Sequence, residues 1–402
     1  MALASPFAEV PQAPPDPILG ITEAYLADPN PGKVNLGVGV YLDETGKVPI
    51  LKCVAEAQRR WIGREDSKGY LPIDGVKTFN RHVQRLILGP ESPAIADGRA
   101  VTVQSLGGTG ALRVGAELLK RFLPGRTVWV STPSWENHRA LFEAAGHTVN
   151  QYPYYDPRSH DLDFAEMAGR IGQLPEQSVV LLHACCHNPS GVDPTHEQWL
   201  KLCDIVRDRG LIPFFDFAYQ GLGDGLDEDA FAVRAFVEAG IPCLIANSFS
   251  KSFSVYRERV GGLTVVTASR DEAGRVLSQL KRVVRASVSN PPSFGAQVVA
   301  TVLDDPELAT MWRDELTAMR HRIRKMRSLF VKTLRDQGVS QDFGFIERQK
   351  GMFSFLGLPV EAVRRLRAEF SVYAVDSSRI CVAAMNEGNV ERVCEAIKAV
   401  AP

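Results

Sequence analysis

One lysine, Lys251, stands in a context that could make its amine a nucleophile. It lies in the serine-rich stretch 247–254, directly after the apolar run 242–246. The run predicts a buried strand, with Lys251 just beyond its carboxyl end. Ligands of open α/β sheets bind at that edge, and a desolvated amine there has a lowered pKa and can attack a carbonyl carbon. Taken alone, such a lysine is more often a surface residue. Other residues of the chain must therefore show whether Lys251 is part of a functional site.

Two further charged residues hold comparable positions. Asp216 ends the apolar stretch 211–215, where a carboxylate must be either paired or functional. Arg259 follows Lys251 in the loop that precedes the apolar run 261–266. A guanidinium binds phosphate oxygens in a bidentate way, and its charge also lowers the pKa of a nearby lysine.

A glycine-rich turn adds a phosphate signal. Residues 107–110 (Gly-Gly-Thr-Gly) precede a predicted amphipathic helix at 111–122, whose first backbone N–H groups would favour an anion. A dinucleotide-binding fingerprint needs a third glycine where this chain has Arg113. NAD therefore fits poorly, while a phosphate group remains consistent with the turn.

The elements that must position these residues alternate between strand and helix. Strands are expected at 101–103, 128–130, 179–182, 211–217, 244–245 and 261–266, and helices at 111–122, 135–145 and 195–209. This alternation predicts a largely parallel sheet covered on both faces. Further elements suggest a smaller α+β domain that includes the N-terminal segment: an extended arm at 11–17, a helix at 18–26, a glycine-interrupted strand at 33–41, helices at 271–286, 306–336, 360–370 and 389–400, and strands at 352–355 and 380–382.

Composition excludes several classes of protein. The 402 residues carry 46 Lys plus Arg against 47 Asp plus Glu, a balance that argues against a nucleic-acid partner or a basic membrane surface. No apolar run approaches the ~20 residues of a membrane span, and no secretory signal is visible. The seven cysteines have no disulfide-type spacing, so we expect a cytoplasmic protein.

The pair Cys185–Cys186, with His183 and His187 nearby, raises the question of a zinc site. Neighbouring residues on a strand point to opposite faces, and no second cysteine or histidine pair follows. We therefore predict buried thiols and no metal.

A series of motifs, in chain order, resembles the fold-type-I pyridoxal-phosphate aminotransferases, specifically the aspartate and aromatic amino acid subgroup. The motifs are NLGVGVY at 35–41, GGTGAL at 107–112, PSWENH at 133–138, CCHNPSG at 185–191, DFAYQG at 216–221, SFSK at 248–251 and RICVA at 379–383. The resemblance covers essentially the whole chain. It implies a large domain at 49–310 with a mostly parallel seven-stranded sheet between helices, a smaller α+β domain from 16–48 and 311–402, and an arm at 1–15.

The resemblance also implies the residues that hold pyridoxal 5'-phosphate. Lys251 would bind it covalently and then act as acid and base. Asp216, supported by His138, would keep the pyridine nitrogen protonated. The remaining residues would contact the ring (Trp135), its phenolic oxygen (Asn188, Tyr219) or the phosphate (Gly108, Thr109, Ser248, Arg259, and Tyr70 from a neighbouring subunit).

Substrate binding by resemblance centres on two arginines. Arg379 would bind the α-carboxylate, with Gly39, Trp135 and Asn188 nearby. Arg285 would reach the distal carboxylate of a dicarboxylic substrate from the other subunit. The implied protein is a homodimer with shared sites that moves amino groups between amino acids and 2-oxo acids, in ping-pong fashion through pyridoxamine phosphate.

Substrate preference depends on two positions. Aspartate-selective relatives usually carry lysine and threonine where this chain has Leu42 and Val48. Both changes favour an apolar pocket, whereas Thr109 and Asn290 match the aspartate branch. We expect an enzyme that uses tyrosine and phenylalanine well and still accepts aspartate and glutamate; a plain aspartate aminotransferase is the alternative.

Two rival classes remain. Residues 248–251 fit Ser-x-x-Lys, the signature of acyl-serine hydrolases, but the accompanying Ser-Asp-Asn and Lys-Thr-Gly motifs do not occur. A non-catalytic relative that keeps only the fold would be expected to lose Lys251, Asp216 or Arg379, and all three are present. A cofactor chromophore in the purified protein would exclude the acyl-serine hydrolase.

Overall fold

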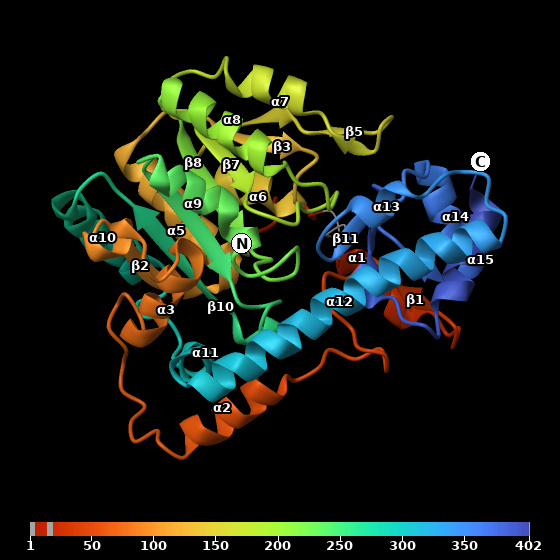
Figure 1. Ribbon diagram of the computed structural model, residues 1–402, viewed down its shortest axis with the longest axis horizontal. Helices are drawn as coiled ribbons and strands as arrows, with labels where there is room; N and C mark the ends of the chain where they lie inside the picture. Colours follow the sequence, from red (N-terminus) through yellow and green to blue (C-terminus); the bar gives the residue numbers. More distant parts are fainter. Residues whose placement is uncertain (1–4, 14–18, 402) are drawn as a thin grey trace.

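A seven-stranded sheet with helices on both faces forms the centre of the computed structural model, which describes residues 5–13 and 19–401 (Figure 1). Its strand order is β2 (Ala100–Leu106), β10 (Val260–Val266), β9 (Cys243–Ser248), β8 (Ile212–Phe217), β7 (Val179–His183), β3 (Val128–Thr132) and β4 (Val149–Pro153). Only β10 runs antiparallel to its neighbours; the pairs from β9 to β4 are parallel. The predicted α/β class with a mostly parallel sheet is confirmed.

Successive side chains along the strands pack alternately into two separate hydrophobic cores. Leu181 and Phe214 belong to one cluster of buried residues, whereas Leu182 and Phe215, one position further along, belong to the other. Both faces are covered, which is why these strands read as continuous apolar runs. One face is covered by α5 (Gly107–Phe122), α6 (Glu136–Ala144) and α10 (Arg270–Ser287), and the other by α3 (Lys77–Leu88), α7 (Phe164–Ile171), α8 (His196–Asp208) and α9 (Phe231–Glu238).

The helix α12 (Pro306–Asp336) connects the sheet region with the C-terminal region (Figure 1). Its 31 residues make a rod of ~46 Å. Asp305 caps its first turn by accepting hydrogen bonds from the N–H groups of Glu307 and Leu308, and proline occupies the first helical position. One end of α12 packs on α2 (Lys52–Ile62) and α11 (Phe294–Asp304), and the other on α13 (Phe345–Arg348) and α15 (Val390–Val400).

The N-terminal and C-terminal segments pair with each other beyond the sheet. Strand β1 (Val34–Asn35) is parallel to β12 (Val372–Tyr373), and β11 (Phe353–Phe355) is antiparallel to β13 (Arg379–Cys381). The other elements are α1 (Leu19–Ala27), α4 (Pro93–Ala96), β5 (Tyr155–Asp156), β6 (Asp161–Leu162), η1 (Glu228–Ala230), η2 (Tyr256–Glu258), α14 (Val360–Phe370) and η3 (Val382–Ala384). The proposed domain boundaries stay a prediction. None of the described helices combines the length and apolar character needed to span a bilayer.

The structure differs from two local predictions and describes only part of two others. The strand expected at 33–41 is wrong beyond Asn35, because the Asn35 side-chain oxygen accepts hydrogen bonds from the N–H groups of Gly37 (3.0 Å) and Val38 (3.3 Å) and turns the chain. Helix α5 starts at Gly107, four residues before the predicted start. The arm expected at 11–17 lies partly outside the described residues, as does the first residue of the helix expected at 18–26.

Candidate active site

The carboxyl edge of the sheet borders a cavity of about 250 Å³. Strands β2, β7, β8 and β9 end there, and β10 starts there after Arg259. Most of the residues predicted from the sequence line this cavity: Gly39, Gly108, Thr109, Trp135, Asn188, Asp216, Tyr219, Ser248, Lys251, Arg259 and Arg379. The cavity therefore brings together residues that are up to 340 positions apart in the chain, from Gly39 to Arg379.

The Lys251 amine has the properties of a nucleophile. Burial lowers the pKa of Lys251 to about 8, an effect that the charge of Asp216 opposes and that of Arg259 reinforces. Its Nζ lies 4.7 Å from the centre of the Tyr219 ring. Among the described residues it has no hydrogen-bond or ion-pair partner, so the amine is free to react with a ligand in the cavity.

Asp216 is a buried anion supported from behind. Burial alone would raise the pKa of Asp216, but the hydrogen bond from His138 Nε2 (2.9 Å) and the nearby charges outweigh it and lower the pKa. The other nitrogen of His138 lies 2.8 Å from Ser134 Oγ, which fixes the ring. His183 is adjacent on β7, and burial lowers its pKa to about 3, so it is neutral. Asp216 thus presents a fixed negative charge to the cavity.

A cationic recess suited to a phosphate lies where β2 meets α5. Gly107 has φ +65°, a backbone conformation that favours glycine, and a Cβ on Gly108 would stand 3.2 Å from Ser248 Cβ. Arg259 donates to Ser250 Oγ (3.2 Å) and to the carbonyl of Tyr256 (3.0 Å), and it has no carboxylate partner among the described residues. A helix N-terminus next to an unpaired guanidinium is an anion site.

At the other end of the cavity, Arg379 is a buried cation without a carboxylate partner in the described chain. Its Nη2 donates to the carbonyl of Gly37 (2.8 Å) and its Nη1 to Asn188 Oδ1 (3.4 Å), while the buried Nε has no partner. The Phe353 ring lies 4.5 Å beneath the guanidinium. Because a buried charge is costly without a counter-ion, this end of the cavity is built for a carboxylate.

Several cavity residues escaped the sequence prediction: Gly37 beside Arg379, and Leu112, Ala218, Ser250, Tyr256 and Phe353 in the lining. Tyr256 occurs in the loop that contains Arg259, and its hydroxyl accepts a hydrogen bond from the N–H of Tyr41 (2.9 Å). Burial raises its pKa. A tyrosine so close to Arg259 in the sequence was a usable signal, whereas Phe353 looked like any apolar strand residue.

Five predicted residues do not line the cavity of this single chain: His138, which lies behind Asp216, and four others. Tyr70 is 94% exposed and Arg285 is exposed, with its Nη1 donating to Ser289 Oγ (2.5 Å). Leu42 packs against the core, and Val48 is 41% exposed. The roles predicted for these four residues stay predictions.

Cys185 and Cys186 do not point to opposite faces of a strand, and the predicted orientation of this pair is wrong. Strand β7 ends at His183, and Cys186 has φ +52°. The two thiols therefore turn toward each other, and their sulfur atoms lie with an Asp229 oxygen within 4.8 Å. Both thiols are buried, as predicted. Asp229 accepts three backbone N–H bonds, from Gly221, Gly223 and Asp224, which accounts for its position without a metal.

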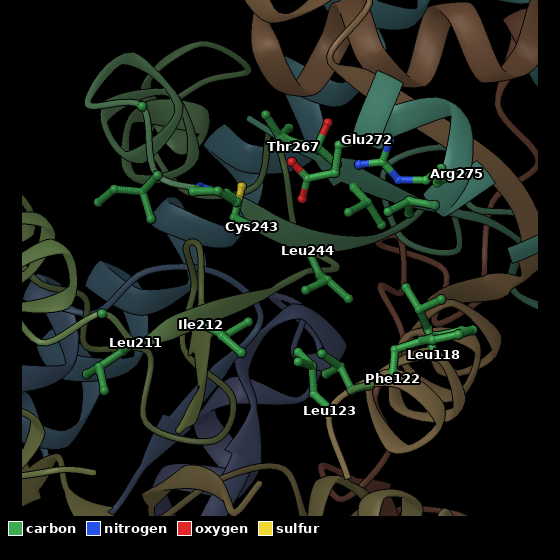
Figure 2. A pocket seen from close by; sticks show the side chains of 18 of the residues that line it. Leu118, Phe122, Leu123, Leu211, Ile212, Cys243, Leu244, Thr267, Glu272 and Arg275 are labelled. Carbon is green, nitrogen blue, oxygen red and sulfur yellow. The ribbon is translucent and has the colours of Figure 1, made fainter. Parts of the chain in front are cut away.

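A larger cavity, of about 880 Å³, lies at the opposite, amino edge of the sheet (Figure 2). The starts of β8 and β9, with Ile212 and Leu244, face Leu118, Phe122 and Leu123 at the end of α5. This lining is mostly aliphatic. Among the described residues, it contains no lysine amine beside a carboxylate, in contrast to the smaller cavity. Size alone therefore does not identify a functional site, and the smaller cavity is the candidate active site because it brings together an amine, a carboxylate and two guanidinium groups.

Comparison with known proteins identifies the family of the chain. Residues 31–397 match the family model for aminotransferase class I and II. The chain is 52% identical to an aspartate aminotransferase of Pseudomonas aeruginosa over 97% of this chain and 98% of that protein, and 47% identical to an aromatic-amino-acid aminotransferase of Escherichia coli over 96% and 97%. An aromatic-amino-acid aminotransferase of Burkholderia pseudomallei, covalently bound to pyridoxal phosphate in its crystal structure, superposes with a TM-score of 0.97 at 51% identity, covering 99% of this chain and 100% of that one. The chain belongs to the class I and II aminotransferases.

Proposed function

We propose that this aminotransferase uses pyridoxal 5'-phosphate to move amino groups between the L-aromatic amino acids tyrosine and phenylalanine and 2-oxoglutarate, and that it also accepts aspartate and glutamate. One observation carries the proposal. A single cavity holds a reactive amine, a buried carboxylate and two guanidinium groups, and neither guanidinium has a carboxylate partner among the described residues. An amino acid and a phosphorylated aldehyde together would supply every missing partner.

The residues present fit this cofactor. Lys251 would hold its aldehyde carbon covalently, and the Asp216 carboxylate would keep the pyridine nitrogen protonated. Ser248, Gly108 and Arg259 would bind its phosphate, with Thr109 beside them. When bound, pyridoxal phosphate supplies an electron sink for the bond that breaks at the substrate α-carbon.

The chain's own residues orient the substrate and move the proton. Arg379 would bind the α-carboxylate through its unpartnered Nε and one Nη, and so fix which bond at the α-carbon lies across the cofactor ring. The Lys251 amine would take the proton from that carbon and return it to the cofactor side. Trp135 would cover the ring, and the buried hydroxyl of Tyr219 would join Asn188 at the phenolic oxygen.

We further propose a cytoplasmic homodimer with shared active sites. Tyr70 and Arg285, the two residues predicted to serve the partner subunit, lie on one surface of the chain. Arg285 bonds Ser289, Ser289 donates to Asn290 Oδ1 (3.2 Å), and Asn290 donates to the carbonyl of Leu71 (2.8 Å), next to Tyr70. This chain of contacts supports a common interface. Sedimentation of the purified protein tests the dimer.

The choice between aromatic and dicarboxylic donors rests on an amino-donor panel with 2-oxoglutarate as acceptor. We expect kcat/KM values for phenylalanine and tyrosine within about tenfold of that for aspartate. A wild-type protein that barely turns over phenylalanine would be a plain aspartate aminotransferase. If protein that carries the cofactor chromophore shows no activity with any of the amino donors, transamination itself is contradicted.

A further inference from the structure

A buried arginine outside the cavity, Arg327, organises a segment that reaches the substrate end. It lies on α12 with only 2% of its surface exposed. Its two Nη atoms donate to five acceptors in the segment 346–354: the carbonyls of Ile346 (3.2 Å), Lys350 (3.3 Å), Gly351 (2.8 Å) and Phe353 (2.8 Å), and Ser354 Oγ. No carboxylate of the described chain forms an ion pair with it.

Packing alone does not explain an arginine at this position. Burial lowers the pKa of Arg327 to about 10, so the side chain is charged at neutral pH. A protein with an apolar side chain of similar volume at this position would usually be as stable as one with a buried charge, or more stable. What the guanidinium supplies is geometry, because its planar fork holds several carbonyls in one place.

The first consequence reaches Arg379 through a strand pair. Arg327 binds Phe353 and Ser354 in β11, and β11 is paired with β13, so that Phe355 stands opposite Arg379. The Phe353 ring also lies directly beneath the Arg379 guanidinium. The position of β11 therefore fixes both the backbone and the underside of Arg379.

A second connection reaches the same guanidinium from the loop after β7. The N–H of Lys350 donates to the carbonyl of Gly191 (2.6 Å). A Cβ on Gly191 would stand 2.6 Å from the Phe353 carbonyl oxygen, so the two segments touch without room for a side chain. This loop carries Asn188, whose Oδ1 accepts the hydrogen bond from Arg379 Nη1.

We propose that Arg327 is a positioning residue that sets the carboxylate-binding geometry of Arg379 by holding the segment 346–354 against β13 and against the loop of Asn188. Arg327 would then control the affinity for the α-carboxylate of every substrate, while leaving Lys251, Asp216 and the phosphate-binding residues unchanged. The inference rests on the proposed role of Arg379.

The test compares Arg327→Lys and Arg327→Met with a matched control, Arg324→Met. Arg324 lies three residues earlier on the same helix, but it contacts Gly223 and Asp224 rather than β11. In the holoenzymes, we expect both Arg327 variants to raise the KM for glutamate and for phenylalanine, by roughly 10- to 100-fold in the methionine variant, with kcat within a few-fold of wild type. The lysine variant keeps the charge but has one nitrogen instead of a fork, so it should recover part of the loss. The control should leave KM unchanged.

A binding measurement separates this inference from the proposed function. Calorimetric titration of each holoenzyme with succinate, a dicarboxylate that cannot react, reports carboxylate affinity whether or not the protein turns over a donor. Weaker succinate binding in Arg327→Lys than in wild type and control, with cofactor affinity unchanged, would support the inference. Wild-type succinate affinity and KM in Arg327→Lys, even with a lower melting temperature, would overturn it and leave transamination intact. If Arg327→Met does not fold, the lysine variant decides.

Discussion

The two ends of the active-site cavity are built in different ways. The cofactor end takes Asp216 and Ser248 from neighbouring strands of one sheet, where ladder hydrogen bonds fix their spacing, and Lys251 from the turn that follows β9. The substrate end joins Gly37, Asn188 and Arg379 from three distant parts of the chain, and single hydrogen bonds hold them together. A rigid cofactor end and an assembled substrate end suit an enzyme that keeps one cofactor and exchanges many substrates.

This difference predicts how each end responds to mutation. Substitutions at the cofactor end should abolish chemistry without moving their neighbours, because the sheet backbone keeps its geometry. At the substrate end, substitutions should change the affinity for substrate. Substitutions in segments outside the cavity should also change it, because each contact depends on another segment.

Lys251→Ala should remove nearly all turnover, by more than the ~10²–10⁴-fold that a positioned acid or base contributes, since the covalent link is also lost. Single-turnover kinetics with glutamate would measure it. Borohydride reduction of the wild type followed by peptide mapping should place the cofactor label on Lys251. A label on another lysine would remove Lys251 from its role.

Arg379→Ala should lower kcat/KM for every amino donor by the equivalent of about 2–5 kcal/mol, the usual effect of removing one partner of a buried charge pair. The loss of kcat/KM should be similar for phenylalanine and aspartate, because both carry the α-carboxylate. The measurement is kcat/KM for both donors. A loss confined to aspartate would show that Arg379 binds the distal carboxylate instead.

The contrast between the two ends also explains what the sequence could predict. Lys251, Asp216 and Arg259 each lie close to an apolar run, so their place at the sheet edge could be predicted from the strands that these runs indicate. The order of the motifs then supplied the roles of their neighbours. Burial of the Lys251 amine, with its lowered pKa, agrees with the expected nucleophile.

The substrate end was harder to predict for physical reasons. Asn35 ends a strand through its own side chain, and this brings the carbonyl of Gly37 to Arg379; periodicity does not register such a turn. Arg327 lies in a long helix rich in charged residues, where nothing distinguishes a buried arginine from its exposed neighbours. Tyr70 and Arg285 were found by resemblance only, and in one chain they face solvent.

Cofactor capture by the cofactor-free protein should depend on pH through Lys251. Burial lowers the pKa of Lys251 from 10.5 to about 8, so the neutral, reactive amine predominates above pH 8 and its fraction falls with each unit below. The rate of chromophore formation should therefore drop about tenfold per pH unit below 8. Arg259→Gln should move the midpoint upward, because the arginine charge lowers this pKa. A pH-independent rate between 6 and 8 would contradict a buried, titrating amine.

Arg285→Ala should separate the two donor classes. If Arg285 meets the distal carboxylate in the partner's cavity, aspartate should lose about 2 kcal/mol more than phenylalanine in kcat/KM. Arg282→Ala, which removes an exposed arginine on the same helix, serves as the matched control. Equal losses for both donors would refute the division of labour between Arg379 and Arg285.

The smallest effect is expected from the double variant Leu42→Lys, Val48→Thr, which introduces the side chains usual in aspartate-selective relatives. Neither residue lines the cavity, but the preceding residue, Tyr41, donates to the hydroxyl of Tyr256 in the cavity wall, and Gly39 lines the cavity directly. The swap should therefore act through this segment or across the subunit interface.

We expect it to shift the ratio of kcat/KM toward aspartate and away from phenylalanine by about 1 kcal/mol. Ile50→Thr, an exposed change in the same segment, should leave the ratio unchanged. Aromatic rings gain from apolar surroundings, whereas a dicarboxylate gains from each added polar contact, so the shift must favour aspartate if these positions tune the substrate end. An unchanged ratio in the double variant would mean that aromatic acceptance arises elsewhere at the substrate end, where Phe353 already provides apolar surface.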